Sequence, residues 1–259
     1  MDARLAVLAL ALWANCAFAQ AFDHSHRPWD ELLRKHVVLL DGAKASQLRY
    51  AGMVRDRALL KDYLERISSV KQSDYARWTR PQQMAFLINA YNAFMVEKIL
   101  TRYPDIRSVW DFGKLFGNPF KDRFFTLFQK SFSLDEIEHE TLRKDFREPR
   151  VHFAVNCASV GCPMLREEAY VGERLERQLE EQAARFLSDR TRNRLALGKL
   201  EVSKIFDWYK EDFEPRAAYF ARYSTLLSDD PAGQKMIADG KAPLSFLEYD
   251  WALNDGARK

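Results

Sequence analysis

The most continuous pattern of apolar positions lies in residues 79–100. Apolar side chains occupy nearly every direction of a helix there, and Thr79 and Gln82 stand at capping-box spacing around Pro81. The pattern predicts a central buried helix that starts at Thr79 and ends at about Leu100. Asn89 and Asn92 fall inside it. A buried amide without a partner is costly, so both are predicted to bond to backbone or to a polar site.

Shorter patterns predict the remaining elements. Helical periodicity predicts helices in residues 28–37, 57–68, 134–144 and 175–187, and alternation or turn signals predict a hairpin in 124–133, strands in 151–156 and 200–202, and a last element in 244–251. In the predicted strand 151–156, His152 and Asn156 share one face, which ends at Cys157. The fold class is therefore α+β: one helix-dominated domain with a small antiparallel sheet packed on the central buried helix.

The first twenty residues have a different character. A short polar start is followed by an apolar run from Leu5 to Trp13, and Ala17-Phe18-Ala19 is the small-x-small pattern that signal peptidase cuts after. The run is too short to span a bilayer. We expect a signal peptide in residues 1–19, a single domain in 20–259, and a periplasmic or secreted protein.

Composition and charge narrow the partners. The chain has 40 Lys and Arg residues against 37 Asp and Glu residues, which gives a formal net charge of +3. The charges are interspersed and form no long basic stripe, so nucleic acid is excluded as a partner. No later segment is long and apolar enough for a membrane span. The expected partner is a small molecule, a peptide or an envelope component, and no cofactor is predicted.

Candidate chemistry gathers around Cys157. A thiol needs a nearby base or cation to become a thiolate at neutral pH, and His152 or His139 could supply it. Polar side chains from the same segment and from the central helix could orient the imidazole or bind an oxyanion. The predicted supporting residues are Asn89, Asn92, Asn156 and Ser159.

Two other interpretations of the same cysteine remain open. Removal of Cys16 with the signal peptide leaves Cys157 and Cys162 as the only cysteines, and an oxidising compartment favours a disulfide between them. Alternatively, His139, His152 and both cysteines could surround zinc, although their spacing matches no standard zinc motif. The predicted site therefore contains no metal.

Several blocks carry a family resemblance. They are Phe86 to Ala93, Ser133 to His139, Arg150 to Pro163, Ser203 to Phe206 with Trp208-Tyr209, and Tyr249 to Trp251 with Leu253-Asn254. Together, over residues 80–254, they resemble the domain-of-unknown-function 547 family. The resemblance implies an exported protein by analogy with bacterial relatives, and it brings no settled activity. A distant analogy to papain-like or transglutaminase-like thiol enzymes rests on fold class alone.

Two functions follow as expectations. The first is a thiol-dependent hydrolase or acyltransferase that acts on an amide or ester, with Cys157 as nucleophile and His152 or His139 as base. The second is a non-catalytic envelope module that binds a partner through the aromatic region of residues 110–128 and is stapled by a Cys157–Cys162 disulfide. The state of the two thiols discriminates between them.

Overall fold

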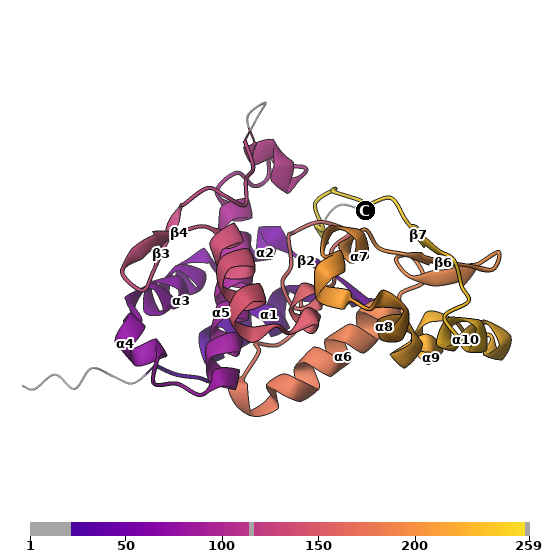
Figure 1. Ribbon diagram of the computed structural model, residues 1–259. Helices are drawn as coiled ribbons and strands as arrows, with labels where there is room; N and C mark the ends of the chain where they lie inside the picture. The colour runs from indigo at the N-terminus through magenta and orange to yellow at the C-terminus, as the bar shows by residue number, and fades with distance from the viewer. Residues whose placement is uncertain (1–21, 114–116, 257–259) are drawn as a thin grey trace, which may run out of the picture.

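Helix α5 (Arg80–Leu100) runs through the middle of the structure (Figure 1), which is a computed structural model that describes residues 22–113 and 117–256. Thr79 and Gln82 form the predicted capping box, with the Gln82 backbone N–H donating to Thr79 Oγ1 at 3.4 Å and the Thr79 N–H donating to Gln82 Oε1 at 3.0 Å. Nearly all side chains from Met84 to Leu100 are buried. The predicted central buried helix is confirmed.

The N-terminal elements cover one side of α5. Trp29 and Tyr63 stack there with ring centroids 6.0 Å apart, which joins the first and third helices. Their apolar faces follow the helical periodicity of the sequence, so the predicted helices in this part are confirmed. In chain order the elements are α1 (Arg27–His36), β1 (Val37–Leu40), β2 (Ala45–Leu48), α2 (Tyr50–Arg55), α3 (Arg57–Ser69) and α4 (Gln72–Tyr75).

The predicted hairpin packs on α5. Strands β3 (Phe125–Leu127) and β4 (Lys130–Phe132) are antiparallel, and Phe125 stacks on Phe94 of α5 with ring centroids 3.9 Å apart. The short 3-10 helix η1 (Val109–Phe112) lies before the hairpin. After it, Ser133 and Glu136 form the predicted capping box, in which each side chain accepts from the other residue's backbone N–H.

The helix after this capping box differs from the prediction in type. Residues Glu136–Phe146 form a π-helix, η2, rather than the ordinary helix predicted for 134–144. Thr141 Oγ1 donates to the Glu136 carbonyl five residues earlier, at 3.1 Å. A wider helix of this kind is common at functional sites, because it changes which side chains share a face. Here Asp135, Glu138 and His139 line the same cavity.

The strand predicted for 151–156 is wrong. Pro149–Phe153 form a 3-10 helix, η3, which begins where the Glu148 carboxylate accepts from the Arg150 backbone N–H at 3.0 Å. Proline fits the first turn of a helix, and the cap satisfies a free N–H. Local capping and packing on α6 therefore override the β-propensity of the valines. His152 and Asn156 consequently share no strand face.

The C-terminal half surrounds a second hydrophobic cluster. Phe153 of η3 enters it and stacks on Phe186, with ring centroids 4.9 Å apart. The predicted helix at 175–187 and the strand at 200–202 are confirmed. The elements are η4 (Gly172–Arg174), α6 (Leu175–Leu187), β5 (Arg194–Ala196), β6 (Lys199–Val202), α7 (Ile205–Trp208), η5 (Lys210–Phe213), α8 (Arg216–Arg222), α9 (Ser224–Leu227), α10 (Pro231–Ala238) and β7 (Leu244–Phe246).

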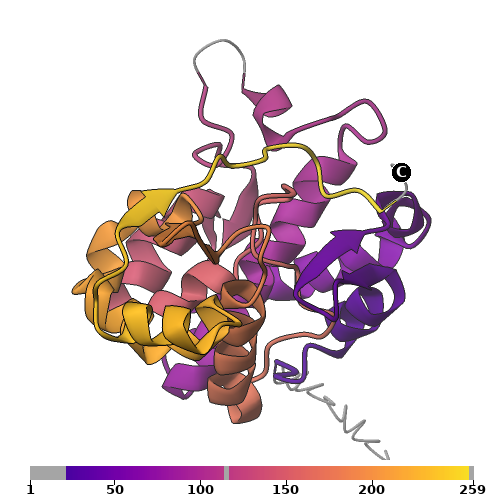
Figure 2. The ribbon, with the colours of Figure 1, turned by 90° about the vertical axis from the view of Figure 1, so that its right-hand side faces the viewer.

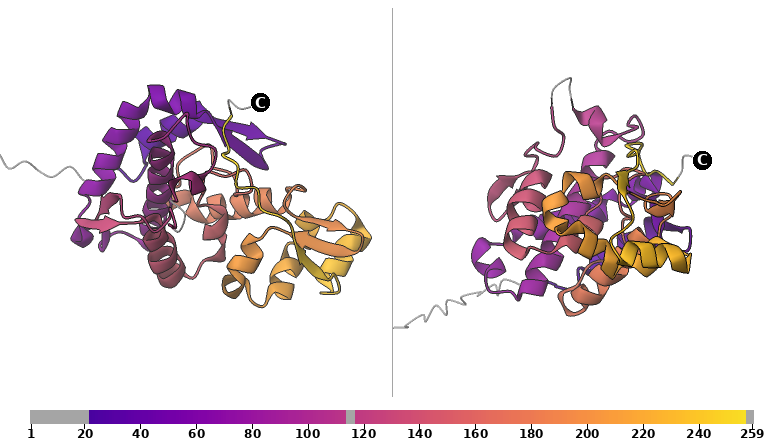
Figure 3. Two further views of the ribbon diagram at one scale, coloured as in Figure 1. Left: turned by 90° about the horizontal axis from the view of Figure 1, so that it is seen from above. Right: turned by 45° about the vertical axis from the view of Figure 1, so that its right-hand side comes forward.

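The described strands form three small sheets rather than one. β1 pairs with β2 and β3 with β4, while β5, β6 and β7 form a three-stranded sheet. All pairs are antiparallel except β6 with β7, which is parallel. Seen from above, the sheet of β5 to β7 lies with the last helices at one end of the molecule, away from α3 and α4 (Figure 3). The α+β fold class is confirmed.

The tail after β7 connects the two halves. It crosses from the C-terminal helices to the N-terminal elements (Figure 2), where the Leu48 N–H donates to the Asn254 carbonyl at 2.9 Å. On the way it pairs with residues 154–163, which contain both cysteines and are called the cysteine loop below. In this pairing the Gly161 N–H donates to the Asp250 carbonyl at 2.8 Å. This crossing places Tyr249 against Cys157 and brings Trp251 to the same cavity.

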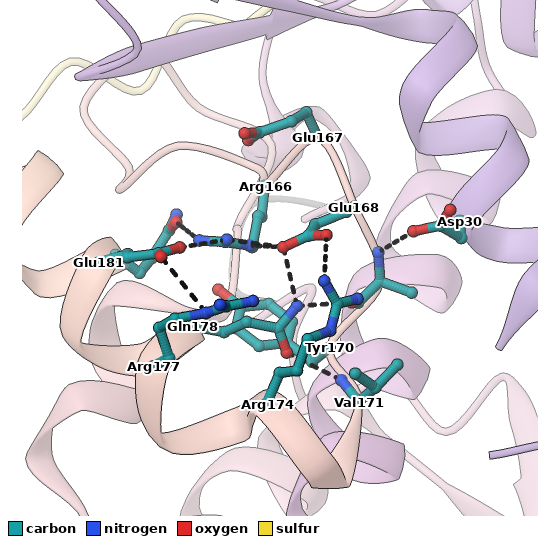
Figure 4. A network of polar contacts seen from close by, with 12 residues as sticks. Asp30, Arg166, Glu167, Glu168, Tyr170, Val171, Arg174, Arg177, Gln178 and Glu181 are labelled. Atoms are coloured by element: carbon teal, nitrogen blue, oxygen red, sulfur yellow. Dashed lines mark hydrogen bonds and ion pairs between the residues drawn. The ribbon is translucent and has the colours of Figure 1, made fainter. Parts of the chain in front are cut away.

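A charged network fixes the segment that follows the cysteine loop (Figure 4). Glu168 is its centre: the carboxylate accepts from Arg166 at 2.7 Å, from Gln178 at 3.0 Å and from Arg174 at 3.1 Å. Arg166, Gln178 and Arg174 come from this segment, α6 and η4, so the network ties these three parts together. These cations and donors lower the pKa of Glu168 to about 2, although its burial acts in the opposite direction.

Two predictions concern membrane and export. Within residues 22–113 and 117–256, no helix has the length and hydropathy that a membrane crossing requires. The predicted signal peptide of residues 1–19 lies outside the described residues, and so does the predicted cleavage after Ala19.

Candidate functional site

A cavity of about 400 Å³ opens where α5, η2, the cysteine loop, α7 and the C-terminal tail meet. Its walls are mainly aromatic, with two carboxylates, two imidazoles and two thiols among them. The lining residues are Tyr91, Trp110, Asn118, Phe120, Asp135, Glu138, His139, His152, Val155, Cys157, Cys162, Pro163, Ile205, Trp208, Tyr209, Tyr249 and Trp251. An apolar pocket with a few converging polar groups is the usual form of a binding or active site.

The Cys157 sulfur is surrounded by hydrogen-bonding groups. Its Sγ lies 2.9 Å from Cys162 Sγ, 3.0 Å from Ser159 Oγ and 3.1 Å from Tyr249 Oη. Ser159 Oγ also lies 3.2 Å from Tyr249 Oη, so its single proton serves one of the two neighbours at a time. The chain therefore folds back around one sulfur atom.

These contacts change the acidity of both thiols. Burial acts to raise the pKa of Cys157, but hydrogen bonds from Cys162, Ser159 and Tyr249 outweigh it and lower that pKa below the ordinary thiol value. Burial and the negative charge on Cys157 raise the pKa of Cys162 well above that value. Burial and the same charge raise the pKa of Tyr249. Of these three groups, Cys157 is therefore the one that loses its proton most readily.

The backbone of the loop supports this arrangement. Ala158 has φ of 63°, in the left-handed region that residues other than glycine and asparagine rarely adopt. The Asn156 side chain holds this turn by accepting from the Ala158 N–H at 2.9 Å, while its amide donates to the Pro163 carbonyl at 2.8 Å. The turn brings Ser159 back over the Cys157 sulfur. Asn156 therefore shapes the loop and lies outside the cavity lining.

His152 lines the same cavity, and two neighbouring side chains fix the position of its ring. Its Nε2 is 2.6 Å from Asp212 Oδ2, and its ring stacks on Tyr209 with centroids 4.0 Å apart. Its Nδ1 has no hydrogen-bond partner among the described residues; the nearest acidic atom is Glu138 Oε1, at 3.8 Å. Asp212 also binds Arg143 through two hydrogen bonds, and burial, His152 and Arg143 together leave its pKa lowered.

His139 also lines the cavity, with different neighbours. Its Nδ1 is 3.0 Å from Arg143 Nη1, and its Nε2 is 3.8 Å from Asp135 Oδ1. Because a guanidinium nitrogen only donates, His139 Nδ1 is the acceptor in this contact. Neither imidazole is among the hydrogen-bond partners of Cys157 that the described residues provide. His152, with one nitrogen anchored and the other unbonded, has the geometry of an acid or base.

The side chains of the two asparagines of α5 form hydrogen bonds with backbone groups. Asn89 exchanges two hydrogen bonds with Tyr170, donating to its carbonyl at 2.7 Å and accepting from its N–H at 3.0 Å. Asn92 donates to the Ala154 carbonyl at 2.9 Å and accepts from the Asn156 N–H at 2.8 Å. The predicted bonding of both amides is confirmed. Asn92 fixes the start of the cysteine loop, and neither amide lines the cavity.

The comparisons with known proteins give one match. The family described as "Protein of unknown function, DUF547" matches residues 75–187, which include α5, both histidines and both cysteines of the cavity. The match confirms the predicted resemblance to this family over residues 75–187. Searches of curated proteins and of solved structures found no match.

The DUF547 match stops before several residues of the site. Beyond residue 187, the cavity is lined by Trp208, Tyr209, Tyr249 and Trp251. Asp212 of η5 also lies beyond residue 187 and binds His152 without lining the cavity itself. The Trp208-Tyr209 and Tyr249 to Trp251 blocks were part of the sequence resemblance, although no role was predicted for them. Glu138 lies inside the Ser133 to His139 block of the resemblance, which assigns it no role. Asp212 had no sequence signal, because nothing local marks an aspartate that pairs with a histidine sixty residues away.

Neither alternative interpretation of the two cysteines has its geometry in the part of the chain that the structure describes. Both thiols are free in this structure, and their 2.9 Å separation exceeds a disulfide bond of about 2.05 Å. The predicted zinc alternative also lacks its geometry: within residues 22–113 and 117–256, no three His, Cys, Asp or Glu side chains converge as metal ligands would. His152 instead uses its Nε2 on Asp212.

Proposed function

We propose that this DUF547 protein is a thiol-dependent hydrolase or acyltransferase that acts on an amide or ester at Cys157. One observation carries the proposal: the Cys157 sulfur, held by three hydrogen-bonding groups that lower its pKa, shares a cavity with a histidine whose Nε2 lies 2.6 Å from Asp212. In most thiol enzymes a base must lie against the sulfur. Here Cys162, Ser159 and Tyr249 stabilise the negative charge, so His152 is free to act on the substrate.

The reaction can be written with these groups. The Cys157 thiolate attacks the carbonyl carbon, a C–S bond forms, and the carbonyl π electrons move to oxygen, which accepts a hydrogen bond from Tyr249. The C–N or C–O bond then breaks, and the leaving group takes a proton from His152 Nδ1. Asp212 stabilises the imidazolium that provides it. Water or another acceptor attacks the thioester, returns a proton to Nδ1 and releases the thiolate.

The acyl-enzyme is the decisive species to test. We expect p-nitrophenyl acetate to give a burst of p-nitrophenolate and to leave one acetyl group, which tandem mass spectrometry assigns to Cys157. Cys157→Ser should abolish the burst and the adduct. His152→Gln should slow deacylation by about 10²- to 10⁴-fold, the usual contribution of a general acid or base.

A matched control separates chemistry from folding. His36 is buried and lies 2.6 Å from Asp56, as His152 does from Asp212, but it is outside the cavity. His36→Gln should therefore leave acylation and deacylation unchanged. A folded wild-type protein that forms no Cys157 adduct would rule out the thiol enzyme and favour the binding module.

We also propose that the protein works outside the cytoplasm, on the strength of the signal-peptide pattern in residues 1–19. An oxidising compartment could then join Cys157 and Cys162, whose sulfurs are already adjacent. A thiol titration of the exported protein under denaturing conditions tests this. Two reactive thiols support the enzyme, whereas none would favour the disulfide staple of the binding module.

A further inference from the structure

The cavity wall contains acidic side chains that no basic Lys or Arg of the described lining balances. Asp135 and Glu138 contribute carboxylates, and no Lys or Arg is among the lining residues within the described part of the chain. The Arg143 guanidinium, which comes from the same helix as Glu138 and His139, is already bound to Asp212 and contacts His139. Among the lining residues that the structure describes, these carboxylates are therefore not matched by a Lys or Arg side chain. Such a wall favours a cation and repels an anion.

Of the acidic side chains in the wall, Glu138 is a buried one. Its side chain is 9% exposed, and the nearest cationic or basic group among the described residues is His152 Nδ1, at 3.8 Å. That distance is too long for a hydrogen bond. A buried carboxylate without a bonded cation is costly, so a cationic ligand beside it gains more than the same ligand would at the surface.

His152 Nδ1 supplies an independent observation. The His152 side chain is 1% exposed and lines the cavity, yet its Nδ1 has no hydrogen-bond partner within the described residues. Buried polar atoms are nearly always paired, so an unpaired one in a cavity wall indicates that a bound molecule or water completes it. It lies beside Glu138, at the acidic part of the wall.

The rest of the wall is suited to an apolar chain. Trp208 stacks on Trp251 with centroids 5.7 Å apart, Tyr249 packs against both, and Trp110 meets Trp251 at 5.2 Å. Trp110 and Trp208 remain 40% and 46% exposed, which is unusual for such large apolar side chains. Their faces can cover methylene groups, and aromatic faces also attract cations.

We propose that the cavity takes a substrate with a protonated amine on an apolar chain: Glu138 and Asp135 hold the ammonium, and the chain lies along the Trp208–Trp251 wall. This deepens the proposed function, because it names the substrate class of the same site. Its first test measures binding alone, and therefore does not depend on turnover.

The binding test uses three probes of equal chain length. Isothermal titration of the wild-type protein at pH 7 compares n-hexylamine, which is protonated, with hexan-1-ol and hexanoate. We expect n-hexylamine to bind at least tenfold more tightly than hexan-1-ol and hexanoate not to bind. Glu138→Gln should weaken n-hexylamine about tenfold or more, as expected for loss of a charged hydrogen bond.

Matched variants control for folding and for general charge. Glu140 lies on the same helix, is ion-paired with Lys144 and does not line the cavity. Glu140→Gln should therefore leave n-hexylamine binding unchanged. If Glu138→Gln fails to fold, Asp135→Asn serves as the second variant. Equal binding of amine and alcohol, or amine binding unaffected by a folded acidic variant, would overturn the proposal.

A turnover test separates this inference from the proposed function. p-Nitrophenyl esters of N-acetyl-lysine, N-acetyl-norleucine and N-acetyl-glutamate differ in side-chain charge, and kcat/KM should be at least tenfold higher for lysine than for norleucine. Equal values for the three esters would overturn the inference and leave the thiol enzyme intact. Selective binding of n-hexylamine without hydrolysis of any ester would support the inference about the ligand and rule out the thiol enzyme.

Discussion

Removal of the Tyr249 hydroxyl tests the idea that donors, rather than a base, activate Cys157. Tyr249 Oη lies 3.1 Å from Cys157 Sγ, and its phenol keeps its proton at neutral pH because its pKa is raised. Tyr249→Phe deletes this donor and little else. Loss of a bond to the charged form destabilises the thiolate, so the pKa of Cys157 must rise.

The size of the change follows from the contacts. A hydrogen bond to a charged group contributes about 1.5–3 kcal/mol, which corresponds to roughly one to two pKa units. Ser159 now shares its proton between Cys157 and Tyr249, at 3.0 and 3.2 Å, and in the variant it can donate to the sulfur alone. This compensation places the expected increase at about one unit.

Alkylation kinetics measure this pKa directly. Iodoacetamide alkylates Cys157, and tandem mass spectrometry can follow the rate of this reaction as a function of pH. In the wild type, the pH of half-maximal rate, which is the midpoint of this dependence, should lie below that of an ordinary thiol. In Tyr249→Phe the midpoint should move up by about one unit. Tyr170→Phe is the control, because that hydroxyl is buried and has no partner among the described residues. An unchanged midpoint in folded Tyr249→Phe would refute the reasoning.

Three further outcomes are expected. Asn89→Leu should lower the free energy of unfolding by about 2–5 kcal/mol in urea titrations, since it leaves both buried backbone groups of Tyr170 unpaired; a change below 1 kcal/mol would contradict this. Glu168→Gln should cost roughly 2 kcal/mol at pH 7, discounted for partial exposure. Because the pKa of Glu168 is lowered to about 2, its contribution is complete above pH 4.5 and is lost as pH falls toward 2, where variant and wild type should unfold alike. Mass analysis of the exported protein should find Gln20 at its N-terminus, and a retained, lipid-bearing Cys16 would refute cleavage there.

Elements that depend on local signals could be predicted from the amino-acid sequence. The capping boxes at Thr79 and Ser133 correctly predicted where two helices begin. The apolar side chains on every side of the helix in residues 79–100 correctly predicted that this helix is buried. These elements are decided by neighbours within one or two helical turns, so they are visible in a linear sequence. Cys157, His152 and His139 were selected by residue chemistry, and all three line one cavity, although His152 lies on η3 and not on the predicted strand.

Tertiary structure decided the rest. Residues 151–153 have the composition of a strand, but η3 is selected by the Glu148 cap and by packing of Phe153 on Phe186. The donors that set the acidity of Cys157 include Tyr249, ninety-two residues away, and the partner of His152 is Asp212, sixty residues away. Such pairings have no sequence period, because they exist only once the C-terminal tail has crossed the molecule and α7 and η5 have packed against η3.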